Sequence, residues 1–472
     1  MAPHPPITRT SPSYLLAAAV LASSMGFIDS SVTAIALPSI RTSLGGSLAA
    51  AEWVQGGYLL ALTSLILVGG AMSDRFGVVR MFQGGIVAFV ASSILCAMAP
   101  SMPLMIAARA LQGLGAAFMV PGSMTLVSRA YPREDRGRAL GLWAAASTAT
   151  TAGGPVLGGL VLTLAGDEAW RAIFALNLPM GAGALWLLAR HANPDKGRPG
   201  TPVDLWGAGL ATLCLGAMAV ALTEGAALAL PAAAICILTA LAFVWLESRL
   251  SAPMIRLGLF RDRAFSAVNL ATLLLYIGLN GVSFYLPMTA ISAWGVTPLG
   301  VTAAFLPISL LIASLSSRAG RLSDRIGAGW PLTLGCLIVA LAYGLIAHFA
   351  PRQDFWHLVV PFSLITGLGL ALLVAPLTAA AMAHAPDADQ GAASGINNAT
   401  ARAAGLIAVA LMGRIAALSY GTITSDRPGF ALPSASLAHH AQTSAAFAQI
   451  AATASLMALA AAAVSAIGLL RR

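Results

Sequence analysis

Charged side chains are scarce in this sequence: only 9% of its 472 residues are Asp, Glu, Lys or Arg, whereas 58% are hydrophobic. A soluble globular protein carries roughly a quarter charged residues. This chain therefore cannot cover a water-facing surface, and it must meet lipid over most of its outside. Its mean hydropathy of +0.83 also excludes long disordered tails. We expect an all-α integral membrane protein without a soluble domain.

Lysine is nearly absent from the sequence, and this scarcity argues against ATP hydrolysis as the energy source. The only copy, Lys196, follows Asp195 rather than the glycine that a nucleotide-binding P-loop requires. The four cysteines lie singly in apolar runs and form no CxxC pair, which argues against a zinc site or a redox motif. No nucleophile or His/Asp/Glu cluster occupies the short loops, so an enzyme is disfavoured. We expect no cofactor and no bound metal.

The net charge of +9 and the pI near 10 come from arginines dispersed between apolar runs, not from one patch. Nucleic acid is therefore not an expected partner. A helix needs about 20 apolar residues to cross a bilayer, and the runs show no period-two alternation typical of barrel strands. Breaks at charged or Pro/Gly-rich gaps predict fourteen spans: 14–37, 53–73, 81–99, 103–127, 138–163, 171–190, 204–223, 229–247, 266–290, 298–317, 330–350, 356–382, 391–416 and 446–470.

The distribution of Lys and Arg predicts the orientation. With the N-terminus in the cytoplasm, 19 of the 26 basic residues fall in inside loops and five fall outside or near outer helix ends; Arg109 and Arg402 fall within spans. This asymmetry predicts an inner-membrane protein with both termini in the cytoplasm and an outer loop near 417–445.

An internal repeat divides the chain. Residues 70–77 (GAMSDRFG) match residues 320–327 (GRLSDRIG) at a displacement of 250. Residues 113–120 match 367–374, and residues 137–141 match 391–395, both at a displacement of 254. Duplicated halves are common in transporters, and this displacement exceeds half the chain length. We predict two six-helix bundles, 1–192 and 265–472, joined by a linker with two extra spanning helices, 193–264.

An acid and an arginine lie inside the predicted spans of the first half. Asp29 occurs in the run Ile28–Pro38, and Arg109 opens the run RALQGLG. An unpaired charge at that depth costs several kcal/mol, and a guanidinium stays charged when buried. Asp29 is therefore a candidate partner for Arg109, and the two residues together are the candidate proton-coupling site. The alternatives are that Asp29 sits in water at the outer mouth and that Arg109 extends to the interface.

Three further groups of polar or small residues are candidates for function. The repeated loop is a candidate conformational latch, in which Asp74 could cap a helix or pair with arginines and Gly77 permits a tight turn. The latch set is Gly70, Asp74, Arg75, Gly77, Arg80, Asp324 and Arg325. A proline among glycines suggests a hinge and packing face at Gly153, Gly154, Pro155, Gly158 and Gly159. Candidate cavity-lining residues are Gln112, Asn397, Asn398 and Arg402.

These motifs together resemble the fourteen-helix branch of the drug:proton antiporters in the major facilitator superfamily. The run Ile28–Pro38 is similar to the family's first-helix motif, with Ser31 and Ala34 as departures. Residues 70–80, Arg109–Gly113 and 153–159 resemble its loop, intramembrane arginine and antiporter motifs, and residues 170–179 look like the fourteen-helix branch. The resemblance implies a major facilitator fold and a proton-coupled exporter that works by alternating access.

The substrate stays open at this point. The family mostly exports lipophilic and cationic compounds, but the second half offers no acid that is securely at membrane depth. Neutral or singly charged amphiphiles, metabolites and lipids therefore remain alternatives, the last implying an exporter or flippase. A non-transporting scaffold is a weaker interpretation because it would not need Asp29 or Arg109. The expected partners are protons, a small-molecule or lipid-like substrate and membrane lipids, and the expected state is a monomer.

Overall fold

The computed structural model describes residues 11–193, 195, 197–198, 200, 202–250, 253–386, 389–421 and 429–470. Within these residues, fourteen helical stretches are long and apolar enough to cross a membrane, which confirms the predicted count. The helices are α1 (Pro12–Leu44), α2 (Leu48–Phe76), α3 (Val78–Ala97), α4 (Met102–Ala130), α5 (Arg133–Ala165), α6 (Trp170–Ala175), α7 (Asn177–His191), α8 (Leu205–Thr223), α9 (Ala226–Glu247), α10 (Arg263–Ser292), α11 (Pro298–Ile326), α12 (Gly329–Phe349), α13 (Phe355–Ala383), α14 (Gln390–Tyr420) and α15 (Leu437–Ser465). Helices α6 and α7 together form one span, Asp167–His191.

The observed helices run past several of the predicted boundaries. The second span, predicted at 53–73, begins at Leu48 and ends at Phe76, and α15 begins at Leu437 although its span was predicted at 446–470. The predicted outer loop 417–445 is therefore shorter, because α14 ends at Tyr420. Hydropathy reports only the part of a helix that contacts hydrocarbon, whereas backbone hydrogen bonds continue into the polar ends.

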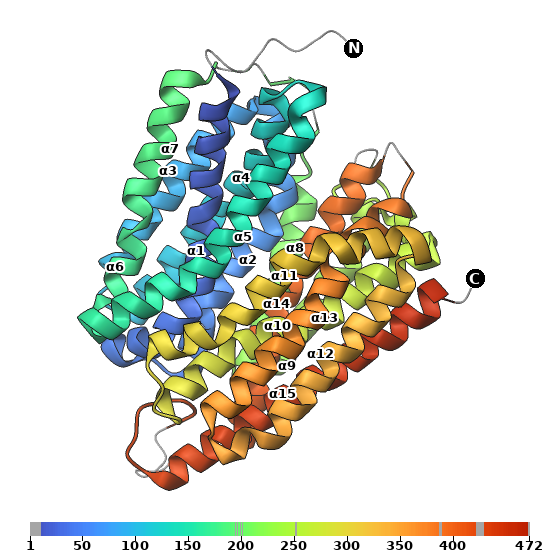
Figure 1. Cartoon of the computed structure of the whole chain (residues 1–472). Coiled ribbons are helices and arrows are strands. Elements are labelled where there is room, and N and C mark those ends of the chain that lie inside the picture. Colours follow the sequence, from blue (N-terminus) through green and yellow to red (C-terminus); the bar gives the residue numbers. More distant parts are fainter. Residues whose placement is uncertain are drawn as a thin grey trace. The chain divides into compact units, whose positions relative to one another are not determined.

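The chain separates into two compact units. Unit 1 comprises residues 1–46, 53–216 and 235–254, and unit 2 comprises residues 47–52, 217–234 and 255–472. In unit 1, α1 packs against α4, α5 and α7, and α3 packs against α4 (Figure 1). In unit 2, α15 packs against α10 and α12, and α13 packs against α11 and α12. The predicted domain limits at 192 and 264 stay predictions.

Glycine pairs repeat the same close helix crossing in each unit. A Cβ built on Gly85 of α3 would lie 2.9 Å from the carbonyl oxygen of Gly115 of α4. A Cβ on Gly335 of α12 would lie 2.8 Å from the carbonyl oxygen of Gly369 of α13. Such contacts are closer than real Cβ atoms tolerate, so only glycine lets these backbones approach. The internal repeat is therefore a repeat of packing as well as of sequence.

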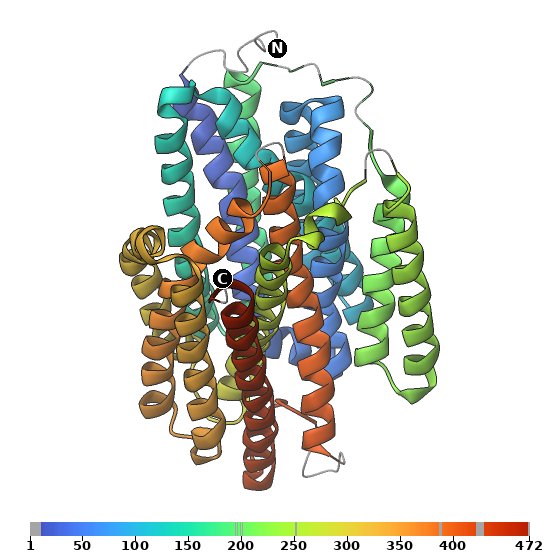
Figure 2. The same ribbon diagram turned by 90° about the vertical axis from the view of Figure 1, so that its right-hand side faces the viewer.

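The inserted helices α8 and α9 form an antiparallel hairpin, drawn in green in Figure 2. Sγ of Cys214 and Sγ of Cys236 lie 3.8 Å apart across it, and both thiols are free. Only 6% of the apolar window of α9 is buried, against 61% for α1. Most of the hairpin surface is thus available to lipid, as its continuous hydrophobic composition predicts.

Five basic residues counted in the orientation argument lie outside the described residues: Arg9, Lys196, Arg427, Arg471 and Arg472.

Candidate functional site

Asp29 and Arg109 form a buried ion pair in the middle of unit 1. Nη1 of Arg109 lies 2.5 Å from Oδ2 of Asp29, and the two side chains are 0% and 1% exposed. Asp29 is on α1 and Arg109 is on α4, two helices that pack directly together. The pairing suggested by the sequence is therefore present. The alternatives of a carboxylate in water and an arginine extended to the interface are wrong for this conformation.

Amide side chains complete the hydrogen bonding around the carboxylate. Nε2 of Gln112 donates to Oδ1 of Asp29 at 2.9 Å and also lies 2.9 Å from Oγ of Ser93. Nδ2 of Asn177 donates to the same Ser93 hydroxyl at 3.1 Å and lies 3.5 Å from Oδ1 of Asp29. Both carboxylate oxygens of Asp29 thus accept hydrogen bonds from buried side-chain donors, Oδ2 from Arg109 and Oδ1 from Gln112.

The guanidinium of Arg109 is held from the other side as well. Its Nε donates to the carbonyl oxygen of Val54 at 3.1 Å, and its Nη2 donates to Oε1 of Gln55 at 3.3 Å. The ring centroids of Tyr58 and Phe174 lie 4.6 and 5.8 Å from Cζ, where an aromatic face attracts a cation. Arg109 is therefore fixed by α2 and α6 whether or not Asp29 stays beside it.

Several of these residues were not singled out as site residues from the sequence: Gln55, Tyr58, Ser93, Phe174 and Asn177. A signal was available for the last two, because both belong to the 170–179 run that resembles the fourteen-helix branch. The sequence gives no such signal for Ser93 and Gln55, since a single polar residue in an apolar span more often bonds to its own helix.

Two glycines of α5 pack against the turn of α1 that carries Asp29. A Cβ on Gly154 would lie 3.0 Å from Cα of Ile28 and 2.8 Å from Oγ of Ser31. A Cβ on Gly158 would overlap the side chain of Val32. The neighbouring Gly153 faces open space, and Pro155 lies inside the unbroken helix. Of the predicted hinge residues, Gly154 and Gly158 thus set the distance between α1 and α5; Gly159 is buried in the same helix.

The predicted latch loop joins α2 to α3. Nη2 of Arg129, in the last turn of α4, lies 3.0 Å from Oδ1 of Asp74. Gly77 has φ of +101°, a conformation that favours glycine, and its N–H donates to the carbonyl oxygen of Ser73 at 3.0 Å. Arg75 and Arg80 are exposed, and Gly70 faces open space. Asp74 therefore pairs with an arginine, but it does not cap α3.

The second copy of the loop repeats the turn without the ion pair. Gly327 has φ of +83°, and its N–H donates to the carbonyl oxygen of Ser323 at 2.9 Å. Asp324 and Arg325 are exposed, and within the described part of the chain no basic group lies within ion-pair distance of Asp324. The repeat thus preserves backbone geometry, whereas the charge contacts belong to the first copy alone.

The candidate polar residues of α14 have different environments. Asn397 is buried, and its Nδ2 donates to Oγ1 of Thr272 at 2.9 Å and to Oδ1 of Asn269 at 3.4 Å. Asn398 is exposed and Arg402 is half-buried. Asn397 therefore joins α14 to α10, as an interhelical hydrogen bond would.

Two buried ionisable side chains of unit 2 escaped the sequence reasoning. Glu52, in the first turns of α2, is 3% exposed, and its Oε1 accepts a hydrogen bond from the Tyr285 hydroxyl at 3.0 Å. His439 falls within the predicted outer loop 417–445, but it is 0% exposed. Its Nδ1 lies 2.6 Å from the Tyr420 hydroxyl, because α15 begins two residues earlier and turns this face inward. Neither position stands out in the sequence, since each borders a helix end.

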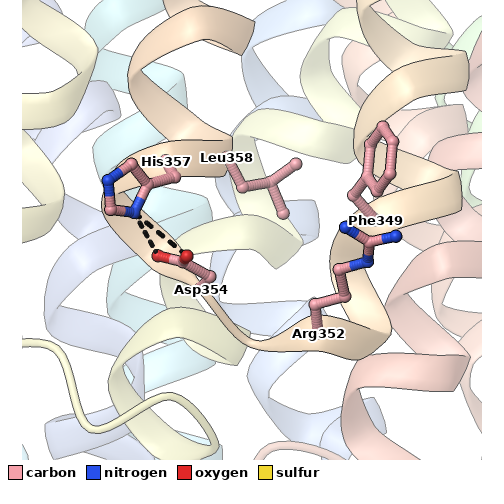
Figure 3. A pocket seen from close by; sticks show the side chains of 5 residues that line it. All are labelled: Phe349, Arg352, Asp354, His357 and Leu358. Carbon is pink, nitrogen blue, oxygen red and sulfur yellow. Dashed lines mark hydrogen bonds and ion pairs between the residues drawn. The ribbon is translucent and has the colours of Figure 1, made fainter.

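A small pocket lies in the connection between α12 and α13 (Figure 3). Its side chains include Arg352, whose guanidinium lies over the Phe349 ring, and His357, whose Nδ1 lies 3.0 Å from both carboxylate oxygens of Asp354. The His357 side chain is 88% exposed. Water therefore solvates these charges, and the pocket lacks the desolvated groups that the Asp29 centre has.

A duplicated bundle of fourteen spanning helices with a buried carboxylate–guanidinium centre is the architecture of a secondary transporter rather than an enzyme. The chain belongs to the Major Facilitator Superfamily, whose family model matches residues 19–410. With fourteen spans and drug-resistance exporters among its relatives, it falls in the fourteen-helix branch suggested by its motifs.

Characterised relatives cover most of the chain. It is 32% identical over 400 residues to multidrug resistance protein Stp of Mycobacterium tuberculosis, covering 83% of this chain and 74% of that one. It is 31% identical to the methylenomycin A resistance protein of Bacillus subtilis, covering 84% and 85%. It is 28% identical to the tetracenomycin C resistance and export protein of Streptomyces glaucescens, covering 85% and 75%.

Solved structures show the same fold at low identity. A bacterial homolog of the human lysosomal transporter Spinster, in an inward-facing and unoccupied conformation, gives a TM-score of 0.72 at 16% identity, covering 98% of this chain and 97% of that one. A D-xylose–proton symporter gives a TM-score of 0.67 at 16% identity, covering 97% of each chain.

Proposed function

We propose that this protein is a proton-coupled exporter of lipophilic small molecules, neutral or carrying a single positive charge, and that it works by alternating access. The observation that carries the proposal is the buried pair of Asp29 and Arg109. Relatives named for drug resistance and export support the direction of transport. A membrane scaffold would gain nothing from such a pair, because replacing a buried ion pair with apolar side chains is often neutral or stabilising.

The pair gives a physical reason for coupling. Protonating Asp29 in the conformation seen here would leave Arg109 buried without a counter-charge, and breaking a buried pair in this way costs about 3–5 kcal/mol. Arg109 is held by α2 and by two aromatic rings, so Asp29 is the partner that can leave. Proton loading thus requires α1 to separate from α4, and return of α1 to Arg109 expels the proton.

The helix that must move is packed through small residues. The turn of α1 containing Asp29 contacts α5 at Gly154 and Gly158, so α5 itself contributes no side chain at these two positions. Small residues allow one helix to slide on another at low cost, because few side-chain contacts must be broken. We assign the 153–159 motif to this sliding contact and the 70–80 loop to a latch that opens and closes with the cycle.

The acids of the second half bear on the substrate. From residue 265 to the C-terminus the sequence contains only Asp324, Asp354, Asp387, Asp389 and Asp426. Of these, Asp324 lies in the last turn of α11, and Asp354 and Asp389 directly precede α13 and α14, so none of these three is near the middle of a span. In the described part of unit 2 the buried carboxylate is that of Glu52, so a multiply charged cation would find few carboxylates there to replace its water. A lipid or amphiphilic metabolite is the second candidate, favoured by the same scarcity.

Substrate-driven proton release tests this proposal. Purified protein in weakly buffered detergent would be mixed with ethidium, tetraphenylphosphonium, a neutral aromatic antibiotic, a dication and a lysophospholipid, while a pH dye reports released protons. We expect release with at least one neutral or singly charged compound and none with Asp29→Asn. The control variant Asp354→Asn removes an exposed carboxylate and should behave as wild type. Release that persists in Asp29→Asn would place the proton site elsewhere.

From the distribution of Lys and Arg we also propose that the protein lies in the inner membrane and that both of its termini are in the cytoplasm. Ala435 is exposed in the connection before α15. In a background without the four native cysteines, an impermeant maleimide added to intact cells should label Ala435→Cys and not Lys196→Cys. The reverse labelling pattern would invert the topology.

A further inference from the structure

The chain that follows α7 folds back onto the latch loop of unit 1. Oδ2 of Asp195 accepts a hydrogen bond from the backbone N–H of Val78 at 2.7 Å, and its Oδ1 accepts one from Val79 at 3.0 Å. The N–H of Arg198 donates to the carbonyl oxygen of Asp74 at 2.8 Å. The first N–H groups of a helix have no partner within it, and Gly77 offers no side chain to cap α3. The cap comes instead from a residue more than a hundred positions away.

The same carboxylate shares an arginine with the latch. Nη1 of Arg129 lies 3.3 Å from Oδ2 of Asp195, while Nη2 of Arg129 lies 3.0 Å from Oδ1 of Asp74. The Asp195 side chain is 8% exposed and that of Asp74 is 53% exposed. Water screens an exposed pair much more than a buried one. Asp195 is therefore the stronger of the two anchors for Arg129.

Glycines on both sides permit this approach. A Cβ on Gly77 would lie 2.5 Å from the carbonyl oxygen of Asp195, and a Cβ on Gly197 would overlap the carbonyl of Arg75. In the second copy of the loop, a Cβ on Gly327 would meet no described atom within 4 Å. Glycine at 327 thus serves the turn alone, whereas glycine at 77 serves both the turn and the contact with the linker.

We propose that Asp195 is a positioning residue that fastens the chain at residues 195, 197 and 198 to the latch loop, so that the latch cannot rearrange unless the linker toward α8 moves with it. This inference rests on the proposed alternating-access function. When Asp195 leaves, two N–H groups of α3 lose their acceptor and Arg129 loses its better-shielded partner. The contact with Asp195 therefore favours the conformation seen here. Through the linker, movement of the latch loop is coupled to movement of the inserted hairpin α8–α9.

The expected effect is a change in conformational populations. Spin labels at Arg138→Cys on α5 and Arg321→Cys on α11, both exposed positions, would be introduced in full-length protein lacking its four native cysteines. Pulsed electron paramagnetic resonance then gives the distribution of distances between the two labels in nanodiscs, without substrate or a proton gradient. Asp195→Asn should change the ratio of the two main distance populations about fivefold, the effect of one shielded charge pair and one cap. Arg129→Gln should change it in the same direction, and the double variant should add little.

Asp262→Asn is the matched control, because Asp262 caps α10 through Phe265 N–H at 2.8 Å but contacts no latch residue in the described part. Hydrogen exchange at residues 78–79 reports the α3 cap separately. Faster exchange there in Asp195→Asn with an unchanged distance distribution would overturn the proposal and leave Asp195 a helix cap. If Asp195→Asn does not fold, the distance distribution of Arg129→Gln tests the proposal by itself, because Asp195 still caps α3 in that variant. The measurement needs no proton or substrate, so repeating it in Asp29→Asn separates this inference from the coupling mechanism.

Discussion

The two halves of this transporter share their packing but not their chemistry. Aligning Gly113 with Gly367 places Ser363 of α13 where α4 has Arg109, and Thr366 where α4 has Gln112. Aligning Pro38 of α1 with Pro287 of α10 places Gly278 where α1 has Asp29. The hydroxyl oxygens of Ser363 and Thr366 are buried, without a hydrogen-bond partner in the part of the chain that is described. Duplication therefore kept the bundle, and among the described residues the buried pair of an aspartate and an arginine occurs in the first half only.

A contact near the centre shows how the two halves keep one geometry with different side chains. In the first half, Val32 of α1 packs into the space left by Gly158 of α5. At the matching positions of the second half the sizes are exchanged: Met412 of α14 packs against Gly281 of α10. The summed volume at the crossing is what a close-packed interior restricts. The difference teaches that helix positions can be inherited while side-chain roles are free to diverge.

The largest expected effect comes from unpairing the centre. Arg109→Gln leaves the Asp29 carboxylate buried without a counter-charge, which should lower stability by about 3–5 kcal/mol. Adding Asp29→Asn should recover most of that loss, because no charge then remains. Ser363→Ala at the matching position should change stability little, since its hydroxyl has no partner to lose. Thermal unfolding of the purified variants measures this, and equal losses at 109 and 363 would contradict the comparison.

The two copies of the loop predict the next effect. Asp74→Asn removes a partner of Arg129 and should abolish turnover while substrate binding is largely kept, because Asp74 pairs with an arginine in the last turn of α4 and not with the buried Asp29 centre. Asp324→Asn removes no ion pair described in the structure and should reduce the transport rate less. Transport in vesicles and binding to purified protein separate the two steps. If folded Asp74→Asn loses substrate binding as well as transport, the assignment of the 70–80 loop as a latch is wrong.

A smaller effect is expected from two adjacent glycines. Gly154→Ala places a methyl group against Cα of Ile28, and such overpacking costs about 1–3 kcal/mol. Gly153→Ala places it in open space, where removing a helical glycine stabilises by about 0.5–1 kcal/mol. Melting temperatures should therefore shift in opposite directions. A shared direction would mean that α1 and α5 are not set apart by Gly154.

The smallest effect concerns the amide at the edge of the centre. Asn177→Ala removes a 3.1 Å hydrogen bond to Ser93 and a long contact to Asp29. Its loss should cost about 1 kcal/mol and move the pH dependence of transport modestly, since Gln112 and Arg109 still hold the carboxylate. The measurement is export rate against external pH beside wild type, with Asn398→Ala, at an exposed position, as the control. A complete loss of coupling in Asn177→Ala would show that Asn177 and not Gln112 is the main amide partner.

Much of the site could be read from the sequence because charge inside an apolar span is conspicuous. Asp29 and Arg109 each interrupt a hydrophobic run, and each needs an opposite charge at the same depth. The pairing followed from that need. Asp195 could not be found this way, because an aspartate in a linker is ordinary and its partners are backbone N–H groups far along the chain. Glu52 and His439 were missed for a related reason: they lie near helix ends, where hydropathy does not separate buried from solvated residues.

The sequence by itself determined the class of protein, the fourteen spans and the duplication, since lipid forces every backbone group into a helix and apolar length sets the number of crossings. It also determined that Asp29 and Arg109 need partners. Only the tertiary structure decided which amides and rings surround them, which glycines set helix distances, and that Asp195 rather than Asp74 caps α3. The physical reason is that membrane insertion depends on the sum of local hydrophobicity, whereas hydrogen bonds and ion pairs depend on the placement, to within a few tenths of an ångström, of side chains that are distant in the chain.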